Sequence, residues 1–195
     1  MNSDLTIAGV VGEFAETELR KFFRASEIGS EQLLITDSNG IIEYVNPAFC
    51  RVTGYSSHDV IGKTPTILKS SRMSAVFYQR LWESLKSGIE WRGEFFNRRK
   101  DGSYYLEKAV ISPIKSNDGT VSHLVKVSED ITSQRQSEDH QLRRLKLIEA
   151  INSANLDFME HGSLHKMAEI ILETCMTITS SSIAILYEML PNGNA

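Results

Sequence analysis

The chain has 195 residues, and its 41% hydrophobic and 24% charged content is that of a globular protein with a real core. Its 21 Lys and Arg against 25 Asp and Glu give a formal net charge of −4, which argues against a general nucleic-acid binder. Cys50 and Cys175 each stand alone without ligand spacing, which argues against a metal site or a disulfide framework.

The first 27 residues predict an N-terminal helical segment. They lack a basic stretch followed by an apolar core, so no signal peptide is expected, and no run approaches the length of a membrane span. We therefore expect a cytoplasmic location and no direct membrane contact. Residues 12–27 place apolar side chains near one helical stripe, namely Phe14, Leu19, Phe22 and Phe23.

Two short strands and small helices follow. Residues 32–36 and 41–45 are apolar runs separated by DSNG, a strong hairpin signal. Asn46-Pro47 ends the second strand, and a short helix closed by Gly54 is expected after it. A further helical turn, capped by Ser56 or Ser57, precedes the turn-like stretch KTPTILKSS.

The middle of the chain predicts a longer helix over 73–87 and then three strands, at 91–99, 103–114 and 121–129. Asp101-Gly102 and Asn117-Asp118-Gly119 supply the turns between the strands. The basic and aromatic residues of 91–114 are compatible with a nucleic-acid patch, but a hairpin with its charges at the solvated turn explains them better. This element order indicates an α+β fold.

The last third predicts helices again. A connecting helix over 133–156 carries a stripe that suits packing against a twin helix, formed by Leu142, Leu145, Ile148 and Ile151. Residues 163–178 predict another amphipathic helix, and 182–189 predict a strand.

Together, TDSNGIIEYVNPAFCRVTGYSSHDVIGK, Trp82, WRGEFFNRRKDGSYYLEKAVISPI and the DIT at 130–132 resemble a PAS domain, over about residues 24–132. The resemblance implies a five-stranded antiparallel sheet with flanking helices over 28–132, an N-terminal helical segment over 1–27 and a connecting signalling helix over 133–156. Residues 157–195 resemble the start of a GAF domain.

PAS domains are sensing and dimerisation modules, so the resemblance implies a sensory module of a bacterial signal-transduction protein that forms a homodimer. Its signal would pass through Asp130, Ile131 and Thr132 to an output domain or partner kinase outside this chain, as in two-component or cyclic-di-GMP systems. Asp130 would tie the last strand to its neighbours, and Thr132 would cap the outgoing helix. No catalytic motif such as GxSxG, a P-loop or HExxH occurs, so an enzyme is not expected.

The resemblance also bears on cofactors. Pro65 stands where light-sensing LOV-type PAS domains carry their flavin-binding Cys, which argues against covalent flavin chemistry, and residues 73–87 hold no His for haem. Asn97 keeps an amide at a flavin-contact position, while Glu107 and Ser128 depart from the expected residues. WRGEFFNRRKDG also resembles FAD-binding PAS domains of nitrogen-fixation regulators, so FAD stays the alternative to an empty or small-molecule pocket.

Strand alternation predicts which side chains face the pocket. The inward set consists of Trp91, Phe95, Asn97, Tyr105, Glu107, Lys126 and Ser128. Glu107 and Lys126 would then approach each other on adjacent strands, and we interpret them as a mutually satisfied ion pair.

The outward side chains of the same strands are too apolar to be left in water. The set consists of Phe96, Leu106, Val110, Val125 and Val127. The N-terminal helix is the expected cover, through Phe14, Leu19, Phe22 and Phe23 against Leu106 and Val110. Covering in trans would make a dimer, and covering in cis would leave a monomer.

Overall fold

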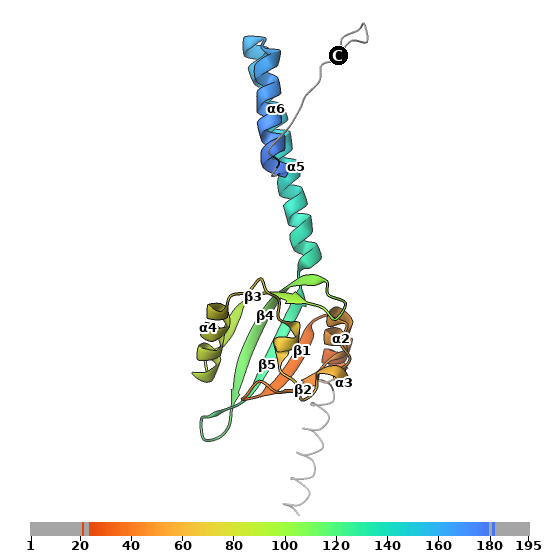
Figure 1. Cartoon of the computed structure of the whole chain (residues 1–195), viewed down its shortest axis with the longest axis vertical. Helices are drawn as coiled ribbons and strands as arrows, with labels where there is room; N and C mark the ends of the chain where they lie inside the picture. The colour runs from red at the N-terminus through yellow and green to blue at the C-terminus, as the bar shows by residue number, and fades with distance from the viewer. Residues whose placement is uncertain (1–20, 22–23, 180, 182–195) are drawn as a thin grey trace, which may run out of the picture. The chain divides into compact units, whose positions relative to one another are not determined.

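A five-stranded antiparallel sheet organises the first part of the chain in the computed structural model, which describes residues 21, 24–179 and 181 (Figure 1). The strand order is β2-β1-β5-β4-β3, and every neighbouring pair is antiparallel. The strands are β1 (Gln32–Asp37), β2 (Ile42–Val45), β3 (Trp91–Arg98), β4 (Tyr104–Lys115) and β5 (Val121–Asp130). The α+β class and the five-stranded sheet expected from the sequence are confirmed.

The predicted turns fix the hairpins. In the β1–β2 turn, the Asp37 carboxylate accepts hydrogen bonds from the backbone N–H groups of Asn39 and Ile41, at 2.9 and 2.8 Å. Gly40 follows with a φ of +84°, and a Cβ built on it would lie 2.6 Å from the Trp82 ring. The turn therefore needs glycine both for its backbone conformation and for the close approach of α4.

Small helices cover one face of the sheet (Figure 1). They are α2 (Pro47–Thr53), α3 (Ser57–Val60), the 3₁₀ helix η1 (Pro65–Leu68) and α4 (Ala75–Lys86). Asn46 caps α2 by accepting from the Phe49 N–H, and Ser56 forms a capping box with Asp59 at α3. The sequence predicts a cap at Ser56 or Ser57, and the structure has it at Ser56, whereas the Asn46 cap was not predicted. The stretch expected to be a turn after α3 contains the 3₁₀ helix η1.

The core lies between this helical layer and the inner face of the sheet. One buried cluster consists of Leu34, Ile42, Val45, Phe49, Val60 and Leu68. The other consists of Leu81, Leu85, Phe95, Ala109, Ile111 and Leu124. The cavity described below is lined by members of both clusters.

Residues from 133 onward form a separate compact unit. Its helices are α5 (Thr132–His161) and α6 (Leu164–Thr179), and Gly162 between them has a φ of +64°. Lys166 on α6 pairs with Asp157 on α5 at 2.9 Å, and α5 buries Ala150 and Ala154. Helix α5 runs past residue 156, where the sequence places the end of the connecting helix.

Several apolar side chains of α5 remain exposed. They are Leu142, Leu145, Leu147, Ile148, Ile151, Leu156, Phe158 and Met159. Within the described residues, no helix has the length and apolar character needed to cross a membrane. The predicted strand 182–189 lies outside these residues, as does most of the predicted N-terminal helix, of which residues 21 and 24–27 are described and helical.

Candidate functional site

The inner face of the sheet carries a group of buried polar side chains. Asn97, Tyr105, Glu107, Lys126 and Ser128 are all buried, and Glu107 is only 1% exposed. The hairpin register explains this, because Asn97 lies opposite Tyr105 and Ile111 opposite Lys126 on the same face. The inward orientation predicted from strand alternation is therefore confirmed for these residues.

Glu107 is the centre of the group. Its Oε2 accepts hydrogen bonds from Asn97 Nδ2 and Lys126 Nζ, and its Oε1 accepts one from Ser128 Oγ, each at 2.6 Å. The ion pair that the sequence predicts between Glu107 and Lys126 is thus present. Three strands, β3, β4 and β5, each contribute to this one carboxylate.

Burial makes the pair sensitive to loss of either partner. A charge without its counter-ion in such a place carries a desolvation cost that its remaining contacts do not repay. The Lys126 ammonium also lies 4.9 Å from the centre of the Phe95 ring, which adds a cation–π contact. Removal of one charged partner alone is therefore expected to cost more stability than removal of both.

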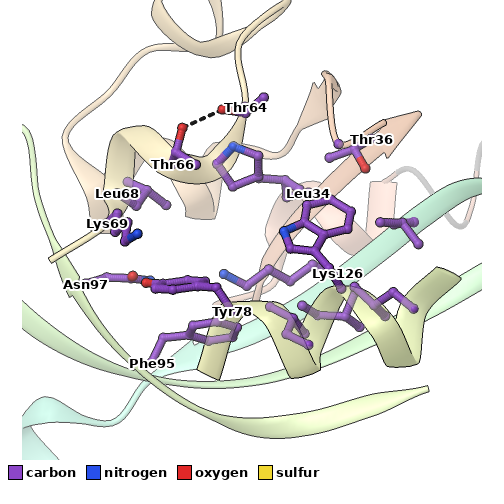
Figure 2. Close-up of a pocket in the computed structure, with 17 residues that line it drawn as sticks. Leu34, Thr36, Thr64, Thr66, Leu68, Lys69, Tyr78, Phe95, Asn97 and Lys126 are labelled. Atoms are coloured by element: carbon purple, nitrogen blue, oxygen red, sulfur yellow. Dashed lines mark hydrogen bonds between the residues drawn. The ribbon is translucent and has the colours of Figure 1, made fainter. Parts of the chain in front are cut away.

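A cavity of about 170 Å³ opens beside this group (Figure 2). Leu34, Leu68, Leu81, Trp82, Leu85, Phe95, Ile111 and Leu124 supply most of its apolar wall. Of the predicted pocket residues, Phe95, Asn97 and Lys126 line it. The wall is mainly hydrophobic with a few polar groups, as in most small-molecule sites.

The other predicted pocket residues lie elsewhere. Glu107, Ser128 and Tyr105 are not part of the wall, and Glu107 and Ser128 contact it through their bonds to Lys126 and to each other. Trp91 is half-buried and packs against Phe77 and Phe95, with ring centroids 5.6 and 4.7 Å apart. Trp91 is a packing residue because α4 supplies Phe77 over it, which strand alternation does not reveal.

Sequence reasoning also missed part of the wall. Lys69, which follows η1, places its ammonium 4.5 Å from the centre of the Tyr78 ring of α4 (Figure 2). Burial, followed by the charge of Glu107, raises the pKa of Tyr78 and keeps it neutral. Thr36, Thr64 and Thr66 add hydroxyl groups. No motif marks these residues, since they come together only in the folded chain.

Two buried side chains near the sheet's inner face have unused polar atoms. Both amide atoms of Gln32 and the Tyr105 hydroxyl have no hydrogen-bond partner, although each residue is only 1% exposed. Gln32 lies opposite Ser128 in the β1–β5 pair. Burial, followed by the negative charge of Glu107, raises the pKa of Tyr105, so the phenol is neutral.

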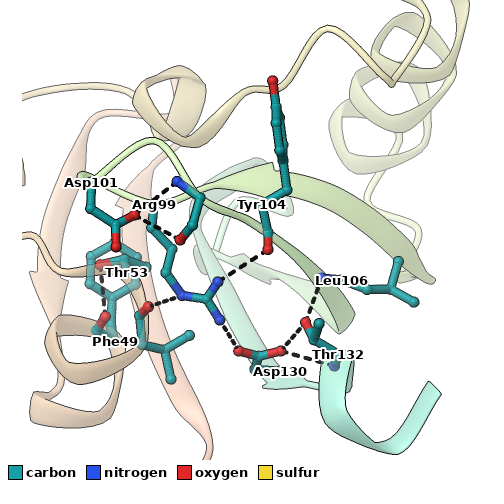
Figure 3. A network of polar contacts seen from close by, with 10 residues as sticks. Phe49, Thr53, Arg99, Asp101, Tyr104, Leu106, Asp130 and Thr132 are labelled. Atoms are coloured by element: carbon teal, nitrogen blue, oxygen red, sulfur yellow. Dashed lines mark hydrogen bonds and ion pairs between the residues drawn. The ribbon is translucent and has the colours of Figure 1, made fainter. Parts of the chain in front are cut away.

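The end of β5 is tied to the rest of the domain by a second polar network (Figure 3). Arg99 pairs with Asp130, donates to the Val52 carbonyl at 2.8 Å and stacks on the Tyr105 ring at 4.6 Å. Asp130 thereby holds the last strand to its neighbours, as the family resemblance implies.

Thr132, the first residue of α5, is held by the same network (Figure 3). Its N–H donates to the Asp130 carboxylate at 3.0 Å, and its hydroxyl donates to the same oxygen. That hydroxyl accepts from the Leu106 N–H at 2.9 Å, and the Ile131 N–H donates to the Leu106 carbonyl. The Thr132 hydroxyl was expected to cap α5, but it bonds to Leu106 of β4 and to Asp130, because the strand end lies within its reach.

The outer face of the sheet is partly open. Leu106 and Val110 are half-buried, and Val127 is 37% exposed. Their predicted partners Phe14, Leu19, Phe22 and Phe23 lie outside the described residues. The dimer surface therefore stays a prediction.

Comparison with known families and proteins gives concordant matches. A sequence model described as "PAS domain" matches residues 30–133. A "Nitrogen fixation regulatory protein" of Klebsiella oxytoca is 32% identical over 142 residues, covering 73% of this chain and 29% of that protein. A "Bacterioopsin transcriptional activator" of Halobacterium salinarum is 30% identical over 121 residues, covering 60% of this chain and 18% of that protein. The chain thus spans less than a third of the length of these relatives.

Two solved structures are similar. The "RNA-binding Light-Oxygen-Voltage Receptor" has a TM-score of 0.57 and 26% identity, covering 64% of this chain and 36% of that chain. A PAS domain from Colwellia psychrerythraea has a TM-score of 0.55 and 21% identity, covering 59% of this chain and 98% of that chain. The second supports the fold alone.

Proposed function

The chain belongs to the PAS domain family, and from this premise we propose that it is a ligand-sensing module that relays cavity occupancy through the start of α5 to an output domain or partner kinase. One observation carries the proposal: Lys126 lines the cavity and is bonded to Glu107, the residue that joins three strands of the sheet. A ligand that contacts Lys126 acts on the whole sheet through that carboxylate.

The backbone of β4, followed by a chain of contacts, connects this carboxylate to α5. Tyr105 lies two residues from Glu107 on β4, and Arg99 stacks on its ring and pairs with Asp130. Asp130 in turn binds the first residue of α5. A shift of β4 relative to β5 changes the bonds of Asp130, and these bonds set where α5 begins.

The test uses hydrogen exchange on the full chain with two small probes, benzene and benzoate. We expect either bound probe to change the exchange of the amides at the start of α5 in the wild-type protein. Asp130→Ala is expected to abolish the change, while Asp118→Ala keeps it, because Asp118 only braces the β4–β5 turn through Thr120. A bound probe without effect on α5, or no binding of either probe, would refute the relay.

A homodimer is part of the same proposal. Half-buried Leu106 and Val110 and exposed Val127 form an outer sheet face that a second copy would cover, and the exposed apolar stripe of α5 suits a twin helix. Sedimentation equilibrium tests this: Leu106→Glu together with Val110→Glu should produce monomers. A wild-type chain that sediments as a monomer would contradict it.

A flavin-binding redox or light sensor is the second candidate. The similarity to a light-oxygen-voltage receptor favours it, because a PAS domain similar to a LOV-type domain is a candidate for flavin binding. Against it, the Asn97 amide is already bonded to Glu107, and the cavity is closer in size to one that holds benzene than to a tricyclic ring. The visible spectrum of the purified protein decides, because bound flavin is coloured and is released on denaturation.

The wider setting belongs to the proposal as well. We place the module in the cytoplasm of a bacterial signalling protein, as a non-enzymatic part without nucleic-acid or membrane contact. A GAF domain that begins near residue 157 would stand between this module and the output, and a longer chain with its activity measured would test that arrangement.

A further inference from the structure

We propose that the cavity takes a small organic carboxylate, with an apolar body the size of one aromatic ring and a carboxylate that accepts hydrogen bonds from Lys126 Nζ. The inference rests on the proposed function, whose cavity it assigns to a ligand class. Three features of the wall lead to it: its size, its charge and its unused donors.

Size limits the ligand's body. The cavity of about 170 Å³ is close to the roughly 150 Å³ of an apolar protein cavity that binds benzene. Members of both core clusters line it, and Trp82 and Phe95 supply aromatic side chains. A single ring with a short polar substituent fills this space without displacing either cluster.

Charge sets the sign of the polar substituent. Lys126 and Lys69 both line the cavity, and among the described residues no Asp or Glu lines it. Glu107 is behind Lys126 and balances it, while Lys69 has no carboxylate partner in the described part of the chain. Tyr78 is neutral. The cavity therefore has a net positive surrounding, which favours an anion over a neutral or cationic ligand.

Donors complete the argument. An ammonium group has three N–H donors, and Lys126 uses one of them, on Glu107. Its side chain is only 10% exposed, so water reaches the remaining donors poorly. Figure 2 shows Lys126 among the residues that line the cavity, with the end of its side chain directed toward the Tyr78 ring. A carboxylate placed there would satisfy donors that the protein leaves free, and charge-assisted bonds are the stronger kind.

The other partners of Glu107 allow a ligand carboxylate to share the Lys126 ammonium group. Its two oxygens already receive three hydrogen bonds, so it does not need Lys126 as its only partner. When a ligand carboxylate shares the ammonium group, Asn97 and Ser128 still hold Glu107. The ligand thus loosens one bond of the set, and this is the change that the relay would transmit.

The experiment compares three matched ligands by calorimetry on the full chain: benzoate, neutral benzamide and cationic benzylamine. We expect benzoate to bind at least about tenfold more tightly than either of the others, the effect of one charge-assisted hydrogen bond. Equal binding of benzamide would overturn the assignment. Benzene binding without benzoate binding would also overturn it, while leaving the cavity and the relay of the proposed function intact.

A pair of variants separates direct contact from general charge. Lys126→Met with Glu107→Gln keeps the net charge of the cavity but removes the ammonium donor, and benzoate affinity should fall at least about tenfold. The control is Lys108→Met with Glu129→Gln, an exposed pair opposite each other on the outer face. An unchanged affinity in the first variant would refute the role of Lys126. If that variant does not fold, the comparison of the three ligands on the wild-type chain decides alone.

Discussion

Glu107→Gln is expected to destabilise the domain severely. The substitution keeps the shape of the side chain but leaves the Lys126 ammonium buried without a counter-ion. Removing one partner of a buried ion pair costs about 3–5 kcal/mol, against a total stability of about 5–15 kcal/mol for an ordinary domain. The new amide also turns a donor toward groups that donate to the carboxylate, namely Asn97, Lys126 and Ser128.

The double variant Glu107→Gln with Lys126→Met tests the cause. It removes both charges together, so the desolvation penalty of the single variants disappears and only neutral hydrogen bonds are lost, at about 1 kcal/mol each. We therefore expect the double variant to be more stable than Glu107→Gln alone. The matched outer-face pair, Lys108→Met with Glu129→Gln, should change the free energy of unfolding by less than about 1 kcal/mol.

Urea unfolding followed by tryptophan fluorescence is the appropriate assay. The chain has two tryptophans, Trp82 and Trp91, and both lie in the sheet domain, so the signal reports this unit and not the separate α5–α6 unit. A loss below about 1 kcal/mol for Glu107→Gln would refute the argument, as would additive losses in the double variant.

Two further predictions concern turns and helix caps. Gly40→Ala should lower the free energy of unfolding by at least about 1–2 kcal/mol, because a φ of +84° disfavours a side chain and the new Cβ would meet Trp82. Gly119→Ala is the control, since Gly119 has a similar φ but nothing within 4 Å of the added Cβ, so it measures the backbone cost alone. Equal losses for the two variants would contradict the clash with Trp82. Lys100, followed by Ser56, holds the pKa of the Asp59 carboxyl well below its ordinary value of 3.8, so its stabilising effect is complete above that value and lost as the pH falls toward the folded-state pKa. Asp59→Asn should therefore flatten the acid side of a melting-temperature profile between about pH 5 and pH 2, and an unchanged slope would show that the cap does not contribute.

The sheet and its ion pair were predictable for a common reason. Glycine turns fix the register of each hairpin, and a side-chain period of two then decides which residues face inward. Glu107 and Lys126 follow from that rule, although they are 19 residues apart. The same rule places Asn97 and Ser128 on the inner face, because they lie on strands of the same sheet.

The cavity wall was not predictable in the same way. Lys69 follows a 3₁₀ helix that has no strong sequence signal, and Tyr78 comes from a helix whose rotation depends on packing. Trp91 has the parity of a pocket residue, yet Phe77 of α4 covers it. Gln32 is the first residue of a strand, and nothing in its neighbours indicates a buried amide without a partner. Such features depend on contacts between layers, which periodicity does not encode.

Arg99 connects the helical layer, β4 and the end of β5 through one side chain. Its guanidinium donates to the Val52 carbonyl in α2 and to Asp130 at the end of β5, and its central carbon lies 4.6 Å from the centre of the Tyr105 ring of β4. A planar fork of donors holds three such directions at once, whereas the single ammonium of a lysine has no stacking plane and no fixed fork. A movement of the helical layer or of β4 therefore changes the same bond to Asp130, the residue that binds the first amide of α5. Because both movements converge there, the proposed relay requires no separate path for each wall of the cavity.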